Sequence, residues 1–252
     1  MDLPRTPSMR LEGKRALVTG ASRGIGFALA AALAEAGAHV TLAARGAEAL
    51  SEAAETLRRA GYGADALALD ITDIGAMREA VDGLDALDIV VNSAGLARHS
   101  PASETTPEDY DAVMAVNLRA AYFLSQAAAR KMQGRGGAIL HVSSQMGHVG
   151  GIDRAVYCAT KHGLEGMTKA MAMEFGPQNV RINTLCPTFI RTPLTEPTFA
   201  DPEKRAWIES KIKLGRVAEV TDLMGPAVFL CSDAAAMITG THLLVDGGWT
   251  AG

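Results

Sequence analysis

The octapeptide TGASRGIG, residues 19–26, decides the fold of this chain. It lies between an apolar run, KRALVTG (14–20), and a run of helical character, FALAAALAEAG (27–37). Glycines in a turn from a buried strand into a helix let the backbone approach a pyrophosphate, which the helix N-terminus then faces. The glycine spacing is G-x-x-x-G-x-G. Because this motif lies between a strand and a helix, it indicates a binding turn more specifically than the glycines alone would. The stretch therefore predicts a dinucleotide-binding α/β unit.

The alternation of strand and helix continues to the end of the chain. Strands are expected at 14–20, 38–44, 64–70, 87–95, 137–144, 180–186 and 241–248. Helices are expected at 27–37, 47–60, 73–82, 107–132, 154–175 and 219–231. Strands that are separated by helices pair in parallel through right-handed crossovers, and continuous apolar runs are buried on both faces. The pattern predicts a doubly wound, Rossmann-type α/β fold whose seven-stranded parallel sheet is flanked by helices.

The chain shows no internal repeat and no low-complexity linker, so one domain is expected over residues 11–252. The first ten residues, MDLPRTPSMR, read as a flexible polar tail without the apolar core of a signal peptide. Residues 188–215 are the longest departure from the alternation, and a long excursion after a strand is where a substrate lid would lie.

Composition excludes several classes of function. Of the 252 residues 48 % are hydrophobic and 21 % charged, and the net charge of −4 argues against a nucleic-acid partner. No apolar run reaches the roughly 18 residues that span a membrane. Cys158, Cys186 and Cys231 are few and odd in number, as expected for free thiols in a reducing cytoplasm. We expect a cytoplasmic protein without a metal site.

The end of the second strand indicates which dinucleotide is preferred. A carboxylate there would bind the ribose 2′-hydroxyl, whereas an arginine would accommodate a 2′-phosphate. The strand ends on Arg45 without a carboxylate, and Arg23 in the glycine turn adds a second positive charge. The pattern favours NADP(H). NAD(H) stays open as the alternative, with both arginines then simply solvated.

Tyr157 and Lys161, in RAVYCATKHG (154–163), are one helical turn apart and would share one face of a helix. A free tyrosine has a pKa of about 10, and a nearby ammonium or the positive charge of an oxidised nicotinamide favours its phenolate. Tyr157 could then donate a proton to a ketone or take one from an alcohol. By itself the pair fits a solvated helix equally well.

Five motifs in order remove that ambiguity: TGASRGIG, NSAG (92–95), AVNL around Asn117, VSS ending at Ser144, and YCATK (157–161). With them the sequence resembles the short-chain dehydrogenase/reductase family from about residue 11 to the end. The resemblance implies a catalytic tetrad of Asn117, Ser144, Tyr157 and Lys161, with Ser144 hydrogen-bonded to the substrate oxygen and Asn117 holding a water that links Lys161 to solvent. It also implies that Asp70 lies near the adenine and that Ile190 and Thr192 contact the nicotinamide carboxamide.

The full set of expected cofactor contacts is Gly20, Ser22, Arg23, Gly24, Ile25, Gly26, Arg45, Asp70, Ile71, Asn92, Ala94, Gly95, Tyr157, Lys161, Pro187, Ile190 and Thr192. Two positions depart from the family pattern: Ser93 where the family usually has asparagine, and Thr188 where it usually has glycine. A β-branched residue cannot adopt a positive φ cheaply. The backbone that enters the lid is therefore expected to run differently.

Basic and polar residues flank the expected substrate pocket, namely Arg98, His99, His148, Arg154 and Arg191. They suit a carboxylate-bearing or polyhydroxylated alcohol or ketone, although solvated loop charges explain them equally well. The stretches GLARHSP, SSQMG and RAWIESKIKLGR are similar to those of sugar-acid and polyol dehydrogenases of the family, such as gluconate 5-dehydrogenases.

Two other functions stay open. One is a 3-oxoacyl-thioester reductase that docks a carrier protein on Arg130 and Lys131, although Gln178 stands where another basic residue is expected. The other is a non-catalytic dinucleotide-binding regulator. As in the family, the helices at 107–132 and 154–175 are expected to pair with their copies, and Trp249 to be buried against a partner. We expect a homotetramer.

Overall fold

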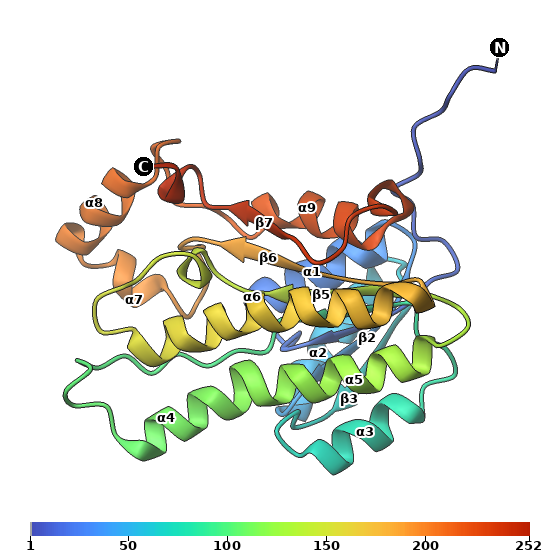
Figure 1. The fold of residues 1–252 in the computed structure, drawn as a ribbon, viewed down its shortest axis with the longest axis horizontal. Helices are drawn as coiled ribbons and strands as arrows, with labels where there is room; N and C mark the ends of the chain where they lie inside the picture. The colour runs from blue at the N-terminus through green and yellow to red at the C-terminus, as the bar shows by residue number, and fades with distance from the viewer. Residues whose placement is uncertain (1) are drawn as a thin grey trace.

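The computed structural model describes residues 2–252, which form a parallel sheet of seven strands in the order β3-β2-β1-β4-β5-β6-β7 (Figure 1). The strands are β1 (Arg15–Thr19), β2 (His39–Ala44), β3 (Ala64–Ala68), β4 (Ile89–Asn92), β5 (Gly137–Val142), β6 (Val180–Pro187) and β7 (His242–Val245). Every neighbouring pair is parallel, with β1 in the middle region paired to both β2 and β4. The predicted doubly wound α/β fold is confirmed.

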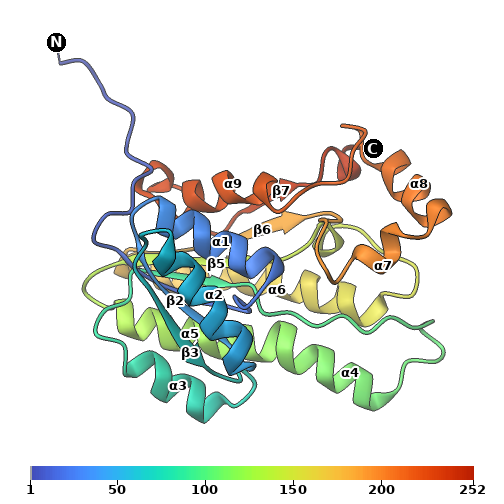
Figure 2. The same cartoon turned by 180° about the vertical axis from the view of Figure 1, so that it is seen from behind.

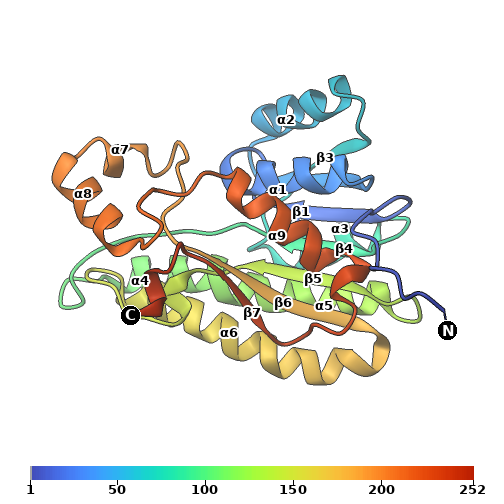
Figure 3. The same ribbon diagram turned by 90° about the horizontal axis from the view of Figure 1, so that it is seen from above.

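Helices cover both faces of the sheet. One face carries α1 (Gly24–Glu35), α2 (Ala47–Arg59) and α9 (Thr221–Cys231), and the other carries α3 (Ile74–Asp82), α5 (Ala121–Met132) and α6 (Ala155–Phe175) (Figures 2 and 3). Successive residues of a buried strand serve opposite layers. Ala16 and Val18 of β1 pack in the cluster that holds α1, whereas Leu17 packs in the cluster that holds α5. Both faces of the strand are thus apolar, as its sequence predicts.

The expected single helix over 107–132 is divided into three parts. Thr106 caps α4 (Pro107–Met114) by accepting a hydrogen bond from Asp109 N at 3.2 Å. A π-helical segment, Ala115–Ala120, then leads into α5. A π turn accommodates one extra residue and redirects the side chains that follow, and such turns are frequent at functional sites. It contains Asn117, which is buried.

Several other boundaries differ from the expected ones. Helix α1 begins at Gly24 rather than at residue 27, and the third strand ends at Ala68 rather than at 70. The fourth strand ends at Asn92 rather than at 95, because the chain leaves the sheet there to pass over the glycine turn. Short 3₁₀ turns complete the structure at Gln145–Gly147, Gly176–Gln178, Asp233–Ala235 and Trp249–Ala251.

Residues 188–215 form an excursion beyond β6 that contains α7 (Glu196–Phe199) and α8 (Pro202–Lys211). It has a small core of its own, in which Phe199, Ile208 and Ile212 pack with Val217. Among the described residues only Asp153 and Asn179 combine a side chain with a positive φ. Thr188 therefore enters the excursion in a conformation that a β-branched residue adopts without strain. Within residues 2–252, no helix has the length and apolar character needed to cross a membrane.

Candidate active site

The predicted site residues follow the carboxyl ends of the strands, where the sheet has one common edge. The glycine turn follows β1, Arg45 follows β2, and Asp70 and Ile71 follow β3. The NSAG segment starts on β4, Ser144 follows β5, and Pro187 ends β6, with Ile190 and Thr192 just beyond. Ligands of open α/β sheets bind at this edge, where strand order reverses.

Two glycines allow the turn after β1 to pack tightly. Gly20 has a φ of +66°, and a Cβ there would lie 2.8 Å from the backbone of Ala94. A Cβ on Gly26 would collide with the carbonyl oxygen of Gly20. The turn is thus pressed against the NSAG segment. Helix α1 has no side-chain cap at Arg23 and no acidic residue in its first turn, so its N-terminal N–H groups suit an anion such as a pyrophosphate.

A chain of buried hydrogen bonds connects the carboxyl ends of β1 and β4 to β5 and α5. Thr19 Oγ1 accepts from Ala94 N at 3.3 Å and donates to Asn92 Oδ1 at 2.7 Å. The Asn92 amide meets His141 Nδ1 at 3.3 Å, and His141 Nε2 meets Ser125 Oγ at 3.0 Å. Burial lowers the pKa of His141 to about 3, so the imidazole is neutral and connects β4, β5 and α5. Sequence reasoning missed His141 and Ser125, since both stand in otherwise apolar segments.

The two arginines proposed for the 2′-phosphate are exposed at the ends of β1 and β2. Within residues 2–252, neither Arg23 nor Arg45 takes part in a salt bridge. The carboxylate of Asp70 accepts hydrogen bonds from Thr72 N and Oγ1 at 2.9 and 2.7 Å. These bonds, and the charge of Arg45, hold the pKa of Asp70 below its usual value despite partial burial. Asp70 is therefore an anionic acceptor beside a free guanidinium.

Asn117 clamps the segment that follows β4. Its Oδ1 accepts from Leu96 N at 2.8 Å, and its Nδ2 donates to Leu96 O at 2.8 Å. The same Nδ2 lies 3.3 Å from Thr160 Oγ1 on α6. Both amide hydrogens and one lone pair of the amide oxygen of Asn117 thus serve to position Leu96 and α6.

Ser144 caps the short turn that follows β5. Its hydroxyl accepts from Met146 N at 3.1 Å and donates to Gln145 Oε1 at 2.9 Å. Ser144 also lowers the pKa of the Tyr157 phenol, so its side chain lies close to that phenol.

Tyr157 and Lys161 lie on one face of α6, as their spacing predicts. Lys161 Nζ lies 5.5 Å from the centre of the Tyr157 ring and donates to Val142 O at 2.9 Å. Burial raises the pKa of Tyr157, while Ser144 and the charge of Arg154 act in the opposite direction. Burial also lowers the pKa of Lys161 to about 8, and the nearby Glu165 carboxylate acts in the opposite direction. The cation that most lowers the tyrosine pKa here is Arg154 rather than Lys161.

The basic residues assigned to substrate occupy different places. Arg98 forms a salt bridge with Asp109, and Arg191 forms one with Glu219 at 3.0 Å. His148 faces Glu165 and β7 rather than the tyrosine. Of Arg98, His148 and Arg154, which the sequence places at the substrate pocket, only Arg154 acts on Tyr157.

Arg154 is half-buried at the start of α6. Its guanidinium donates to His99 Nε2 at 2.7 Å, and the His99 ring meets the Tyr157 ring edge-on at 6.1 Å. Burial, and then the charge of Arg154, lower the pKa of His99, so its ring is neutral and accepts this bond. The pair places a guanidinium and an imidazole beside the side chain of Tyr157.

An aromatic cluster that sequence reasoning missed links this pair to the excursion after β6. Arg154 lies 5.4 Å from the centre of the Phe189 ring, which packs 5.7 Å from Trp249. Trp249 in turn meets Trp207 of α8 edge-on at 5.6 Å. Trp249 is half-buried by this packing on the excursion of its own chain, and its burial against a partner stays a prediction. The cluster joins residues from distant parts of the sequence, so no local pattern announces it.

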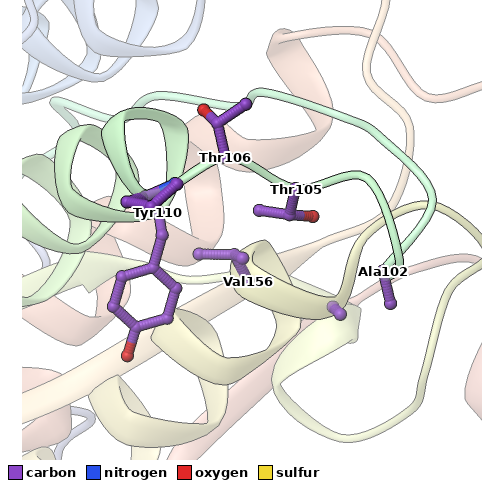
Figure 4. A pocket seen from close by; sticks show the side chains of 7 residues that line it. Ala102, Thr105, Thr106, Tyr110 and Val156 are labelled. Atoms are coloured by element: carbon purple, nitrogen blue, oxygen red, sulfur yellow. The ribbon is translucent and has the colours of Figure 1, made fainter.

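A hollow of about 440 Å³ lies between residues 102–107 and the start of α6 (Figure 4). Its lining includes Thr105, Thr106, Tyr110 and Val156. No member of the tetrad lines it, although Val156 precedes Tyr157. The hollow is therefore separate from the catalytic edge of the sheet.

Comparison with known proteins gives relatives over nearly the whole chain and the same fold. The model of the family described as Enoyl-(Acyl carrier protein) reductase matches residues 20–250. The chain is 43 % identical over 245 residues to D-erythrulose reductase of Gallus gallus, covering 96 % of this chain and 98 % of that protein. It is 40 % identical over 245 residues to L-xylulose reductase of Bos taurus, covering 96 % and 99 %.

Among solved structures, a gluconate 5-dehydrogenase from Burkholderia cenocepacia J2315 in complex with NADP and tartrate superposes with a TM-score of 0.94. Its sequence is 35 % identical, and the match covers 97 % of this chain and 98 % of that chain. The fold is thus shared over nearly the full length of both chains.

Proposed function

The chain belongs to the short-chain dehydrogenase/reductase family, and on that premise we propose that it is an NADP(H)-dependent oxidoreductase interconverting a ketone and a secondary alcohol on a sugar, sugar acid or polyol. The observation that carries the proposal is the grouping of Tyr157 with Lys161 and with Ser144, which follows β5 at the same carboxyl edge of the sheet where the glycine turn follows β1. A nicotinamide supplies the hydride when bound. The residues of the chain hold the substrate and move the proton.

Tyr157 is the proton donor to the carbonyl oxygen in the direction of reduction. Burial raises the pKa of the phenol, so Tyr157 carries at neutral pH the proton that reduction requires. Ser144 stabilises the negative charge that develops on the substrate oxygen, by turning its hydroxyl proton from Gln145 Oε1 to that oxygen when the substrate is bound. For alcohol oxidation the phenolate must form, and Arg154, Lys161 and the positive nicotinamide of the oxidised cofactor all favour it.

Lys161 passes the proton onward. A pKa of about 8 lets it exist in both protonation states near neutral pH, which suits a relay between Tyr157 and solvent. The main chain of the π-helical segment at Asn117 would hold the connecting water, because the Asn117 side chain is already bound to Leu96.

NADP(H) is the proposed cofactor, and NAD(H) is the alternative. The proposal rests on the exposed guanidinium groups of Arg23 and Arg45 and on the absence of a carboxylate at the end of β2. Fluorescence titration with NADPH and NADH tests it. NADPH should bind at least about tenfold more tightly, and Arg45→Ala should abolish that margin, since one charged contact contributes about 1.4 kcal/mol or more.

The substrate class follows from the groups around Tyr157. Arg154 and His99 offer hydrogen-bond donors to hydroxyl or carboxylate oxygens, and residues 188–215 serve as a lid over them. Relatives named for erythrulose, xylulose and gluconate support a short ketose, a keto-sugar acid or the matching polyol.

A 3-oxoacyl-thioester reductase is less favoured, because the Lys131 ammonium that would dock a carrier protein is bound to Asp82 O at 2.8 Å. All four members of the tetrad are present, which disfavours a non-catalytic regulator.

The proposed assembly is a homotetramer in the cytoplasm. Tyr110 and Tyr122 are 46 % and 44 % exposed on α4 and α5, which supports contact between copies along these helices. Three free cysteines support a reducing compartment. Light scattering on purified protein at micromolar concentration should give the mass of four chains.

The substrate proposal is tested by following NADPH consumption with a panel of four-, five- and six-carbon ketoses and keto-sugar acids. A substrate from this panel should turn over with a kcat/KM of at least about 10⁴ M⁻¹s⁻¹. Activity on 3-oxoacyl thioesters alone would replace the proposal by its alternative.

A further inference from the structure

A second group of chemically active side chains meets behind the tetrad. His148 follows Ser144 by one short turn, Glu165 lies one helical turn beyond Lys161 on α6, and His242 begins β7. One ligand atom of each lies within 4.8 Å of the other two. We propose that His148, Glu165 and His242 bind one divalent transition-metal ion per chain, of the kind that Zn²⁺ and Co²⁺ represent.

The two imidazoles are positioned as a pair against the carboxylate. Their ring centres lie 4.2 Å apart with the planes tilted by 45°. His148 Nε2 points toward Glu165 Oε1 at 3.9 Å, which is too long for a hydrogen bond. This nitrogen is buried and has no hydrogen-bond partner among the described residues. A buried nitrogen aimed at a carboxylate without bonding to it is explained by a ligand between them.

The carboxylate is held in place before any ion arrives. Glu165 is 6 % exposed, and its Oε2 accepts from Thr184 Oγ1 at 2.8 Å. Its Oε1 accepts from Cys186 Sγ at 3.3 Å. Hydrogen bonds of this kind orient ligating carboxylates in metal sites. The absence of a side chain at Gly147 leaves room for Glu165, because a Cβ there would lie 3.1 Å from Glu165 Cγ.

The donor set fits a borderline-soft ion. Two imidazoles and one carboxylate, with water in the fourth position, are an established ligand set for zinc. Ligand atoms about 2.0–2.2 Å from a tetrahedral ion lie roughly 3.4 Å from one another, so the three side chains must close by about 1 Å. His242 is exposed on the edge strand of the sheet, and its side chain is free to make that movement. No sequence motif predicts this group of ligands, since the three residues come from three separate elements.

The site would tie the segment after Ser144 to α6 and β7. The proposal does not depend on the substrate or the cofactor, because its test needs neither. Full-length protein without a polyhistidine tag is treated with EDTA, dialysed, and titrated with ZnCl₂ by calorimetry and with CoCl₂ by visible absorption. One ion per chain is expected, with Co²⁺ bands of a four- or five-coordinate site and no thiolate charge-transfer band.

His242→Ala and His148→Ala should each weaken Zn²⁺ binding at least about a hundredfold, beyond the roughly 10–100-fold effect of losing an orienting partner. His162→Ala is the matched control, since His162 is an exposed histidine on α6, the helix that carries Glu165, and lies outside the cluster. It should retain wild-type affinity. Circular dichroism in EDTA establishes whether each variant is folded. If a variant does not fold, the Co²⁺ spectrum of the wild type tests the proposal instead, through the expected bands of a four- or five-coordinate site.

Three outcomes would overturn the proposal. The first is unchanged Zn²⁺ affinity in both cluster variants, and the second is loss of affinity in His162→Ala. The third is one ion for every two chains, which would place the site between copies of the chain.

Discussion

Replacing Lys161 by methionine should stabilise the protein while it removes the proton relay. Burial lowers the pKa of Lys161 from its ordinary 10.5 to about 8, so the folded chain binds the proton less tightly than the unfolded chain. Below pH 8 both states carry the proton, and folding bears the full penalty of roughly 3 kcal/mol. Between pH 8 and about 10.5 the unfolded chain binds more protons, so stability rises with pH until the penalty is gone.

The Lys161→Met variant lacks this penalty but loses the hydrogen bond to Val142 O, which contributes about 1 kcal/mol. Its free energy of unfolding should exceed that of the wild type by about 2 kcal/mol at pH 7. The difference should vanish by about pH 10 as the wild-type lysine becomes neutral. Urea unfolding followed by tryptophan fluorescence, at several pH values and with EDTA present, measures both quantities.

Lys169→Met is the matched control, because Lys169 is exposed on the same helix. It should change stability by less than about 0.5 kcal/mol at every pH. A Lys161→Met variant that is less stable than the wild type at pH 7, or more stable by an amount that does not vary with pH, would refute the reasoning.

Three further variants test the site at separate points. Gly26→Ala should abolish NADPH binding or folding, because its Cβ would collide with Gly20 O; retained tight binding in a titration would contradict the packing of the turn. Ser125→Ala should lower the free energy of unfolding by about 1–3 kcal/mol, since His141 Nε2 then lacks its partner, and urea denaturation measures the loss. Arg154→Gln should raise KM for a keto-sugar acid at least about tenfold and move the basic limb of the kcat profile to higher pH, because Arg154 lowers the pKa of Tyr157. A substrate-saturation series over pH measures both effects, and an unchanged profile would remove Arg154 from the pocket.

The parts of the fold that depend on local pattern were predictable. Continuous apolar runs such as that of β4 can be buried on both faces only in a parallel sheet, and the glycine turn follows from its place between β1 and α1. The pairing of Tyr157 with Lys161 follows from helical spacing alone. These features need no knowledge of what packs against them, which is why the sequence sufficed.

The parts that depend on contacts between distant segments were not predictable. The π-helical segment holds Asn117 where its side chain binds Leu96, and nothing in AVNL predicts that contact. Trp249 meets Phe189 and Trp207 through the fold alone. His148 is a similar case, since its sequence position after Ser144 predicts the substrate pocket while its side chain faces Glu165 and His242.

The central claim is that Tyr157 transfers the proton in a nicotinamide-dependent reduction. Tyr157→Phe removes one hydroxyl and leaves the ring that packs against His99. We expect this variant to bind NADPH with wild-type affinity and to reduce the best ketose of the panel about 10²–10⁴ times more slowly. A variant that retains most of the wild-type kcat, with NADPH binding unchanged, would contradict the claim and leave the tyrosine without a chemical role.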